Sequence, residues 1–136
     1  MLIVLLTCML WQTPAAVDAD GLTGLMRAAA RGDGPAVAAL LAGGADVNAE
    51  HAELRLTALM FAAYFGKDEV VRALLAKGAK ANMKDATGAG AADWATAGDH
   101  PGTTTTLTKA GAQLNPFLNV GLLPFALMDK AGAAPR

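Results

Sequence analysis

The sequence predicts an all-α protein in which about three helix-turn-helix units stack as a solenoid, with a C-terminal capping segment. Three observations predict this fold. Identical residues recur along the chain at a nearly fixed spacing, and each unit carries two apolar stripes with helical periodicity. A glycine follows the second stripe of each unit. The chain has 136 residues, 54% hydrophobic and 17% charged, as expected for one folded domain. Because aromatic residues make up 5% and alanine occurs 32 times, the core must be packed from small and aliphatic side chains.

Residues of one type recur at i+34 in the first step of the repeat and at i+33 in the second. The longer spacing relates Thr23 to Thr57, Gly32 to Gly66, Gly44 to Gly78, and Asn48 to Asn82. The shorter spacing relates Gly78 to Gly111, Ala79 to Ala112, and Asn82 to Asn115. The extra residue of the second unit falls within residues 49–56, and the units span residues 20–49, 50–84 and 85–115.

Each unit is expected to contain two short helices with one apolar face. In the first helices, i, i+3, i+4 stripes are formed by Leu25, Ala28 and Ala29, and again by Leu59, Ala62 and Ala63. Alanine at two of the three positions lets neighbouring first helices approach closely. The second helices carry Val37, Leu40 and Leu41, and Val70, Val71, Leu74 and Leu75. Gly44 and Gly78 then suit the left-handed residue that ends a helix.

The first two units resemble the ankyrin repeat. From Asp20 the first reads DGLTGLMRAAARGD and then GPAVAALLAGGADVN; from Thr57 the second reads TALMFAAYFGK and then DEVVRALLAKGAKAN. The family pattern is D-x-x-G-x-T-P-L-H-x-A-A-x-x-G-H-x-x-V-V-x-L-L-L-x-x-G-A-x-V-N. The resemblance covers about residues 20–115 and implies an ankyrin-repeat solenoid with short β-turn fingers.

Some residues depart from this pattern. Gly24 and Ala58 replace the expected proline, and Met26 and Met60 replace the expected histidine. The third copy keeps Asp85, Gly88, Ala95, Leu107 and the segment from Lys109 to Asn115. It has Gly90 in place of threonine, Ala92 in place of leucine, and residues 103–106 are all threonine where helix two should be aliphatic. We therefore expect modest stability, since three repeats are about the minimum for a stable stack.

The N-terminal residues 1–19 are predicted to be a signal peptide. The apolar run from Leu2 to Trp11 is too short to cross a bilayer but matches a secretory h-region. Cleavage would precede Asp20, after Val17-Asp18-Ala19, with Thr13-Pro14-Ala15 as a weaker alternative. Because no Lys or Arg precedes the run, either the start amine alone supplies the positive charge or the true start lies further upstream. The alternative to a signal peptide is an N-terminal helix packed on the domain. Whether the leader is cleaved or retained as an anchor also stays open.

The leader predicts a periplasmic or secreted protein, with no stable membrane span after cleavage. The alanine-rich composition suggests a bacterial source.

Residues 116–136 form a C-terminal cap or tail. Asn115 and Pro116 could cap and start a further helix. Residues 117–128 are apolar but interrupted by Pro124. We expect this segment to fold over the open end of repeat three and compensate for its threonine-rich helix; the alternative is a partner-docking peptide.

The composition argues against catalysis and against metal or cofactor binding. The chain has no serine and one cysteine, Cys8, so it offers no serine nucleophile and no cysteine-based zinc site. His51 is expected to be a solvated loop residue, His100 a helix-start or turn residue, and Trp94 a core residue. With 11 Lys and Arg against 12 Asp and Glu, the chain lacks the basic excess expected of a nucleic-acid-binding protein.

The resemblance implies that another protein binds the concave face, which is built from the finger tips and the ends of the first helices. By register, the candidate contacts are Arg31, Glu53, Leu54, Arg55, Leu56, Tyr64, Phe65, Lys84 and Thr87. Tyr64 and Phe65 with Leu54 and Leu56 are the expected hot spot, although both rings could instead pack against the next repeat.

We expect a monomeric, non-enzymatic binding module without a cofactor. The alternatives are a regulator, protector or inhibitor of an envelope enzyme, or a secreted effector.

Overall fold

The computed structural model describes residues 17–118 and 124–132 of the chain. In these ranges it contains seven helices and no strand beyond an isolated antiparallel bridge between Val17 and Thr23. The helices are α2 (Gly24–Arg31), α3 (Gly34–Ala42), α4 (Ala58–Tyr64), α5 (Asp68–Ala76), α6 (Ala91–Ala97), α7 (Pro101–Lys109) and α8 (Phe125–Gly132). The predicted leader lies almost wholly outside the described residues.

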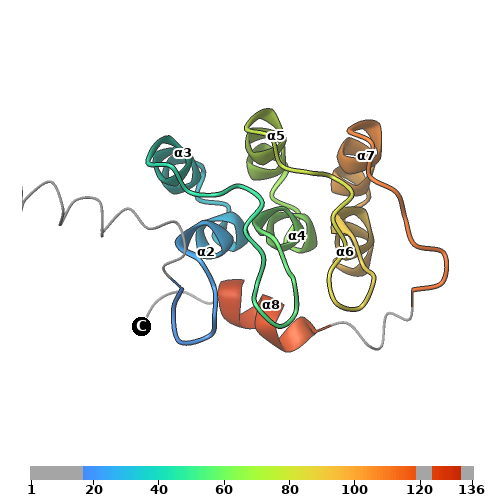
Figure 1. Ribbon diagram of the computed structural model, residues 1–136. Coiled ribbons are helices and arrows are strands. Elements are labelled where there is room, and N and C mark those ends of the chain that lie inside the picture. The colour runs from blue at the N-terminus through green and yellow to red at the C-terminus, as the bar shows by residue number, and fades with distance from the viewer. Residues whose placement is uncertain (1–16, 119–123, 133–136) are drawn as a thin grey trace, which may run out of the picture.

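The helices form three antiparallel pairs that stack side by side. Figure 1 shows α2, α4 and α6 in one row and α3, α5 and α7 in a second row above it. The loops that connect one pair to the next all project from the same side of the stack. This arrangement confirms the predicted all-α solenoid of three repeats.

Alanine lines the contact between neighbouring inner helices. Ala29, Ala62, Ala63, Ala92 and Ala95 are all fully buried. Since a methyl group occupies little space, α4 can lie close to both α2 and α6. Larger buried side chains, among them Phe61, Leu74, Trp94 and Leu107, fill the space around this seam. The burial of Trp94 confirms its prediction as a core residue.

The helix ends follow the repeat pattern with substitutions. The Thr23 hydroxyl accepts a hydrogen bond from the Met26 N–H at 3.2 Å, and Thr57 does the same for Met60 at 3.4 Å. Repeat three has Gly90 at this position, and the Asp93 carboxylate instead accepts from the Gly90 N–H at 2.8 Å. The predicted left-handed glycines are also present: φ is 94° at Gly44 and 92° at Gly78.

The threonine-rich helix α7 gives the stack a polar end. Thr104, Thr105 and Thr106 each donate a hydroxyl hydrogen bond to the carbonyl four residues earlier. Only Thr103 and Leu107 of α7 are buried, and the Thr103 hydroxyl donates to Asp68 at the start of α5. Threonine is tolerated on the outer face of α7 because, among the described residues, no further repeat packs against that face.

The asparagine that ends each unit binds the backbone of the next unit. The Asn48 amide donates to the Gly78 carbonyl at 3.1 Å, and its oxygen accepts from the Lys80 N–H at 2.9 Å. Asn82 makes the equivalent pair with Gly111 and Gln113, at 2.7 and 2.8 Å. These paired bonds fix the register between successive repeats.

Within the described residues no further repeat packs after Asn115, and its side chain bonds to its own unit instead. Its amide donates to the Gly88 carbonyl at 3.0 Å, and its oxygen accepts from the Phe117 N–H at 3.0 Å. The described residues after it, 116–118, form a turn and not a helix. The predicted helix start at Asn115 and Pro116 is therefore corrected, because the asparagine oxygen closes a local turn instead.

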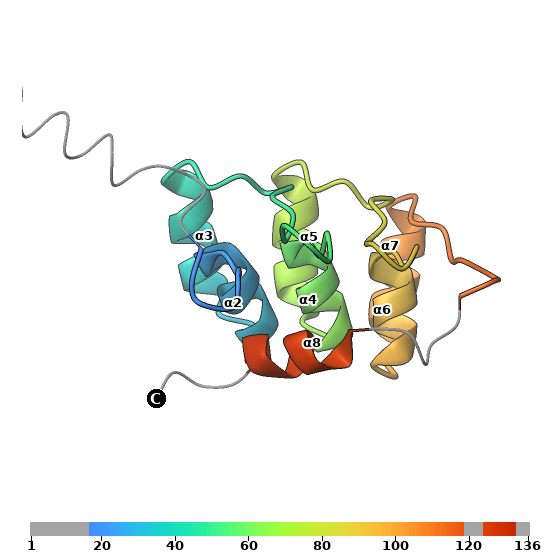
Figure 2. The same ribbon diagram turned by 60° about the horizontal axis from the view of Figure 1, so that its bottom comes forward.

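The C-terminal helix α8 lies across the inner helices of repeats one and two. Figure 2 shows it crossing the ends of α2 and α4 that lie farthest from the finger loops. We expected this segment to cover the open end of repeat three, so its position is a correction. The physical reason is that Met128 and Ala131 are fully buried where α8 lies, whereas α7 offers a polar threonine surface.

The asparagine bridges lead to a stability prediction. Asn82→Ala removes one donor and one acceptor at the interface between repeats two and three, and should lower the free energy of unfolding by about 1–2 kcal/mol. Urea denaturation followed by circular dichroism measures this loss. Gln113→Ala is the matched control, since Gln113 takes part in the bridge through its backbone. Equal stability of both variants would contradict a role for the bridge in setting register.

Candidate functional site

Each repeat begins with a tight loop that we call a finger. The fingers of repeats one, two and three comprise residues 18–22, 51–56 and 85–89, and we refer to them as fingers 1, 2 and 3. In each, the first N–H donates to the last carbonyl: Asp18 to Leu22 at 3.0 Å, His51 to Leu56 at 2.8 Å, and Asp85 to Ala89 at 2.8 Å. The second finger is longer by one residue than the other two, so the inserted residue lies in this loop.

His51 takes the structural place of an aspartate. In finger 3, the Asp85 carboxylate accepts from the N–H groups of Thr87 and Ala89, at 2.8 and 3.0 Å. In finger 2, His51 Nδ1 lies 3.3 Å from the Glu53 nitrogen and 3.1 Å from the Leu54 nitrogen and accepts from both N–H groups. Nδ1 must then be unprotonated, which leaves the Nε2–H to donate to the finger 1 carbonyl of Asp20 at 3.0 Å.

The expectation of a solvated His51 was therefore wrong, because the side chain is 8% exposed. The signal that could have found its role is the repeat register, which aligns His51 with Asp18 and Asp85. His100, in contrast, directly precedes α7 and confirms its prediction as a helix-start residue.

Arg55 occupies a backbone conformation that the other fingers assign to glycine. Its φ is 57°, while the equivalent residues Gly21 and Gly88 have φ of 75° and 84°. A non-glycine residue in this region costs about 1–2 kcal/mol. The Arg55 side chain is exposed and lies 3.5 Å from Glu50, a surface pair that contributes little to stability. The local backbone strain is thus not offset by a strong contact.

The structure separates the predicted finger contacts into two groups. Glu53 and Arg55 are exposed and Leu54 is half-buried, so these three residues form the accessible tip of finger 2. Leu56 is fully buried in the core, which corrects its assignment to the binding surface. Its neighbour Thr57 caps α4, so Leu56 directly precedes a helix whose first six residues are all buried.

Of the remaining predicted contacts, Lys84 and Thr87 in repeat three form hydrogen bonds within the chain, whereas Arg31 in repeat one is exposed. Lys84 Nζ donates to the Gln113 carbonyl at 2.9 Å and lies 3.7 Å from the Asp93 carboxylate. The Thr87 hydroxyl donates to Asp85 at 2.6 Å. Arg31 ends α2 and is exposed, at the opposite end of the inner helix from the finger tips.

Tyr64 and Phe65 belong to an aromatic cluster, defined as Tyr64, Phe65, Trp94 and Phe125. The ring centroid of Tyr64 lies 4.9 Å from Phe65, 5.7 Å from Trp94 and 5.8 Å from Phe125. Trp94 and Phe125 are 5.6 Å apart. The alternative in which Tyr64 packs against the next repeat is thereby confirmed, and α8 adds a contact that was not predicted.

The cluster also changes the chemistry of Tyr64. Burial raises the pKa of the Tyr64 phenol above its ordinary value, and the negative charge of Asp129 in α8 raises it further. The Trp94 indole N–H donates to the Asp85 carboxylate at 2.9 Å, which connects the cluster to finger 3.

Arg27 connects finger 1 to the C-terminal end of α8. Its guanidinium pairs with Asp18 and, at 2.9 Å, with Asp20, and donates to the Lys130 carbonyl at 3.2 Å. Lys130 Nζ in turn lies 3.5 Å from Asp20. The hydrogen bond with Arg27 holds the pKa of Asp18 below its ordinary value. A cation at the last carbonyls of a helix is favourable, so Arg27 also stabilises the end of α8.

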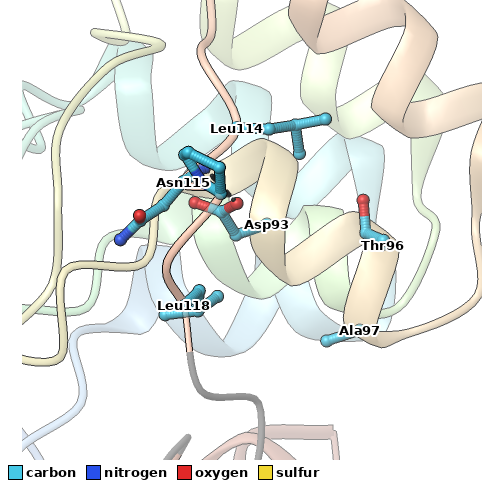
Figure 3. Close-up of a pocket in the computed structure, with 7 residues that line it drawn as sticks. Asp93, Thr96, Ala97, Leu114, Asn115 and Leu118 are labelled. Carbon is cyan, nitrogen blue, oxygen red and sulfur yellow. Dashed lines mark hydrogen bonds between the residues drawn. The ribbon is translucent and has the colours of Figure 1, made fainter.

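A cavity of about 660 Å³ lies at the open end of repeat three, between α6 and residues 114–118. It is lined by Asp93, Thr96, Ala97, Leu114, Asn115, Pro116 and Leu118. In Figure 3 the Asp93 carboxylate points toward Asn115, whose N–H donates to it at 2.8 Å. Because Asp93 also caps α6, its carboxylate has a structural role in this cavity.

The part of the chain that the structure describes contains no cluster of three His, Cys, Asp or Glu side chains that could hold a metal ion. Within the same residues, no helix has the length and apolarity required to cross a bilayer.

A family model described as ankyrin repeats, in three copies, matches residues 5–117. The chain belongs to the ankyrin repeat family. Ankyrin repeats are protein–protein interaction modules, which makes the finger and inner-helix surface the candidate functional site. No curated protein matches the chain. The match begins at residue 5, so it overlaps the predicted leader of residues 1–19.

The position of His51 leads to a prediction about finger 2. His51→Leu removes the acceptor for two backbone N–H groups and should destabilise the fold by about 1–3 kcal/mol. His51→Asn keeps a side-chain acceptor and should recover part of this loss. Thermal unfolding of both variants checks the expectation, and equal destabilisation of the two would refute the acceptor role.

The position of Tyr64 predicts its titration. Since the folded state disfavours the phenolate, Tyr64 should ionise above pH 10, and this stabilising contribution should be lost as the pH rises from 10 through the folded-state pKa. Tyr64 is the only tyrosine of the chain, so phenolate absorbance reports it alone. Asp129→Asn should lower the pKa, and the urea-denatured chain provides the ordinary value. Identical titration of folded and denatured chains would contradict the burial of Tyr64 beneath α8.

Proposed function

We propose that this chain is a monomeric, non-enzymatic module that captures one partner protein on the concave side of its repeats. The observation that carries the proposal is the tip of finger 2. Arg55 keeps an unfavourable left-handed backbone and exposes its guanidinium, where both other fingers have glycine. Backbone strain at an exposed polar residue is typical of positions kept for binding. Glu53 and Leu54 beside it supply an acidic group and an apolar contact.

Several features support the remaining parts of this proposal. The polar outer side of α7 favours a monomer, because it offers little apolar area for a second copy. The net charge of −1 lacks the overall basic excess that is typical of proteins that bind nucleic acid.

We also propose that the protein comes from a bacterium and reaches the periplasm or the medium by way of the predicted leader. Cleavage before Asp20 would remove Asp18, whose carboxylate accepts from the Asp20 and Leu22 N–H groups and pairs with Arg27. Cleavage after Ala15 would retain it, and we therefore favour that site. N-terminal sequencing of the protein from cell fractions tests both the export and the cleavage site. An uncleaved cytoplasmic chain would contradict export.

Two arginines provide a matched test of the binding surface. Arg55→Ala should lower the recovery of a partner about tenfold in affinity capture from the envelope of the source cell, because exposed arginines are frequent hot spots. Arg72→Ala is the control, since Arg72 is exposed on the outer helix α5. Mass spectrometry identifies and quantifies the captured protein. Equal recovery with both variants would exclude the tip of finger 2 as the contact.

Capture also separates the more specific functions. If the captured protein is an enzyme, its activity with and without this chain distinguishes a regulator, protector or inhibitor from a passive binder. Recovery of the chain beyond the cell envelope would favour a secreted effector. Alanine substitution of Tyr64 and Phe65 is less informative about a partner, because both rings contact α8 within the chain itself.

A further inference from the structure

α8 packs against α2 and α4, and we call the surface that it covers the groove. Phe125, Met128 and Ala131 lie on one face of α8 at i, i+3 and i+6; Met128 and Ala131 are fully buried, and Phe125 packs into the aromatic cluster. Gly132 lies directly against Phe65, since a Cβ atom at position 132 would come within 2.6 Å of the ring. The groove thus accepts an aromatic ring, a long apolar chain and then two small residues.

The polar groups around the groove determine the direction of its occupant. At one end Arg27 binds a carbonyl in the last turn of α8, and Asp20 lies near the Lys130 ammonium group. At the other end Phe125 lies against Tyr64 and Trp94. Since helix C-termini favour cations, a helix in this groove should have its C-terminus at Arg27.

Within residues 17–118 and 124–132, no backbone–backbone hydrogen bond joins α8 to the repeats. With eight residues it is shorter than helices that are stable alone in water, so it is helical because it is docked. Among the described residues, its contacts to α2, α4 and α6 are made through side chains and the Arg27 bond to one carbonyl. The helix can therefore leave the groove without breaking the hydrogen bonds that hold the repeats together.

We propose that α8 is an intramolecular ligand, and that the partner binds by inserting an amphipathic helix of the same chemistry in its place. Such a helix carries an aromatic residue, then methionine or leucine three positions later and small residues six and seven positions later, with a cation in its last turn. This inference rests on the proposed function, because it specifies the kind of partner and the surface that it uses. It also makes α8 a competitor that lowers the apparent affinity for the partner.

The probe is a labelled synthetic peptide with the sequence of residues 124–136, titrated into the full chain. Gly132→Leu places a side chain against Phe65 and should release α8, while Ala126→Leu alters an exposed position on the same helix. A tethered helix has an effective concentration on the order of millimolar, so the peptide should bind Gly132→Leu at least about tenfold more tightly than the natural chain or Ala126→Leu. A peptide carrying the equivalent of Met128→Asp should not bind.

Circular dichroism and the Tyr64 titration accompany the binding measurement. If α8 is a ligand, Gly132→Leu keeps the helicity of the repeats and shifts the Tyr64 pKa toward its ordinary value. Unfolding of Gly132→Leu, or equal peptide affinity for all three chains, would overturn the proposal and make α8 a permanent part of the fold.

The capture experiment then separates the two proposals. Higher partner recovery with Gly132→Leu, reversed by added peptide, supports displacement of α8. Unchanged recovery with Gly132→Leu, together with a loss with Arg55→Ala, rejects the displacement of α8 but leaves the finger surface as the contact. Recovery that is insensitive to Arg55→Ala rejects the proposed finger surface, and the peptide titration still decides whether the groove accepts a helix in trans.

Discussion

The close approach of α2, α4 and α6 through alanine side chains is the constraint on which the rest of the structure depends. Ala29, Ala62, Ala63 and Ala92 leave no room between neighbouring inner helices, so the helix pairs must stack in one register. Each alanine removes little apolar surface from water, and a single pair could not fold alone. Stability therefore depends on contacts between successive units, which the asparagine bridges reinforce at the loops.

The chain has few aromatic side chains, and most of them lie together in one cluster. It has four phenylalanines, two tryptophans and one tyrosine, and four of these seven residues form the aromatic cluster. The cluster lies between the end of α4, the middle of α6 and the start of α8. The same residues that would make an exposed hot spot for a partner are thereby covered by the chain itself, which connects the stability of the solenoid to access to its concave side.

The repeat geometry is kept although the residues that produce it change. An aspartate closes fingers 1 and 3, whereas the Nδ1 atom of His51 closes finger 2, because both groups accept from two backbone N–H donors. A threonine hydroxyl caps α2, whereas the Asp93 carboxylate serves the equivalent end of α6. Repeat three departs from the family pattern in sequence because different side chains make the equivalent contacts. Its backbone nevertheless forms the same helix pair and finger.

The sequence by itself determined the period, the helix pairs and the left-handed glycines that follow the second helices. These features depend on interactions within one unit or between copies of the same pattern, so they are visible as spacing. Only the tertiary structure decided the position of α8, the burial of Leu56 and the engagement of His51 and Tyr64. Each depends on a segment far away in the chain or on the shape of one irregular loop. A tail with an apolar face docks on whichever surface is complementary in volume and charge, and that surface exists only after the repeats have stacked.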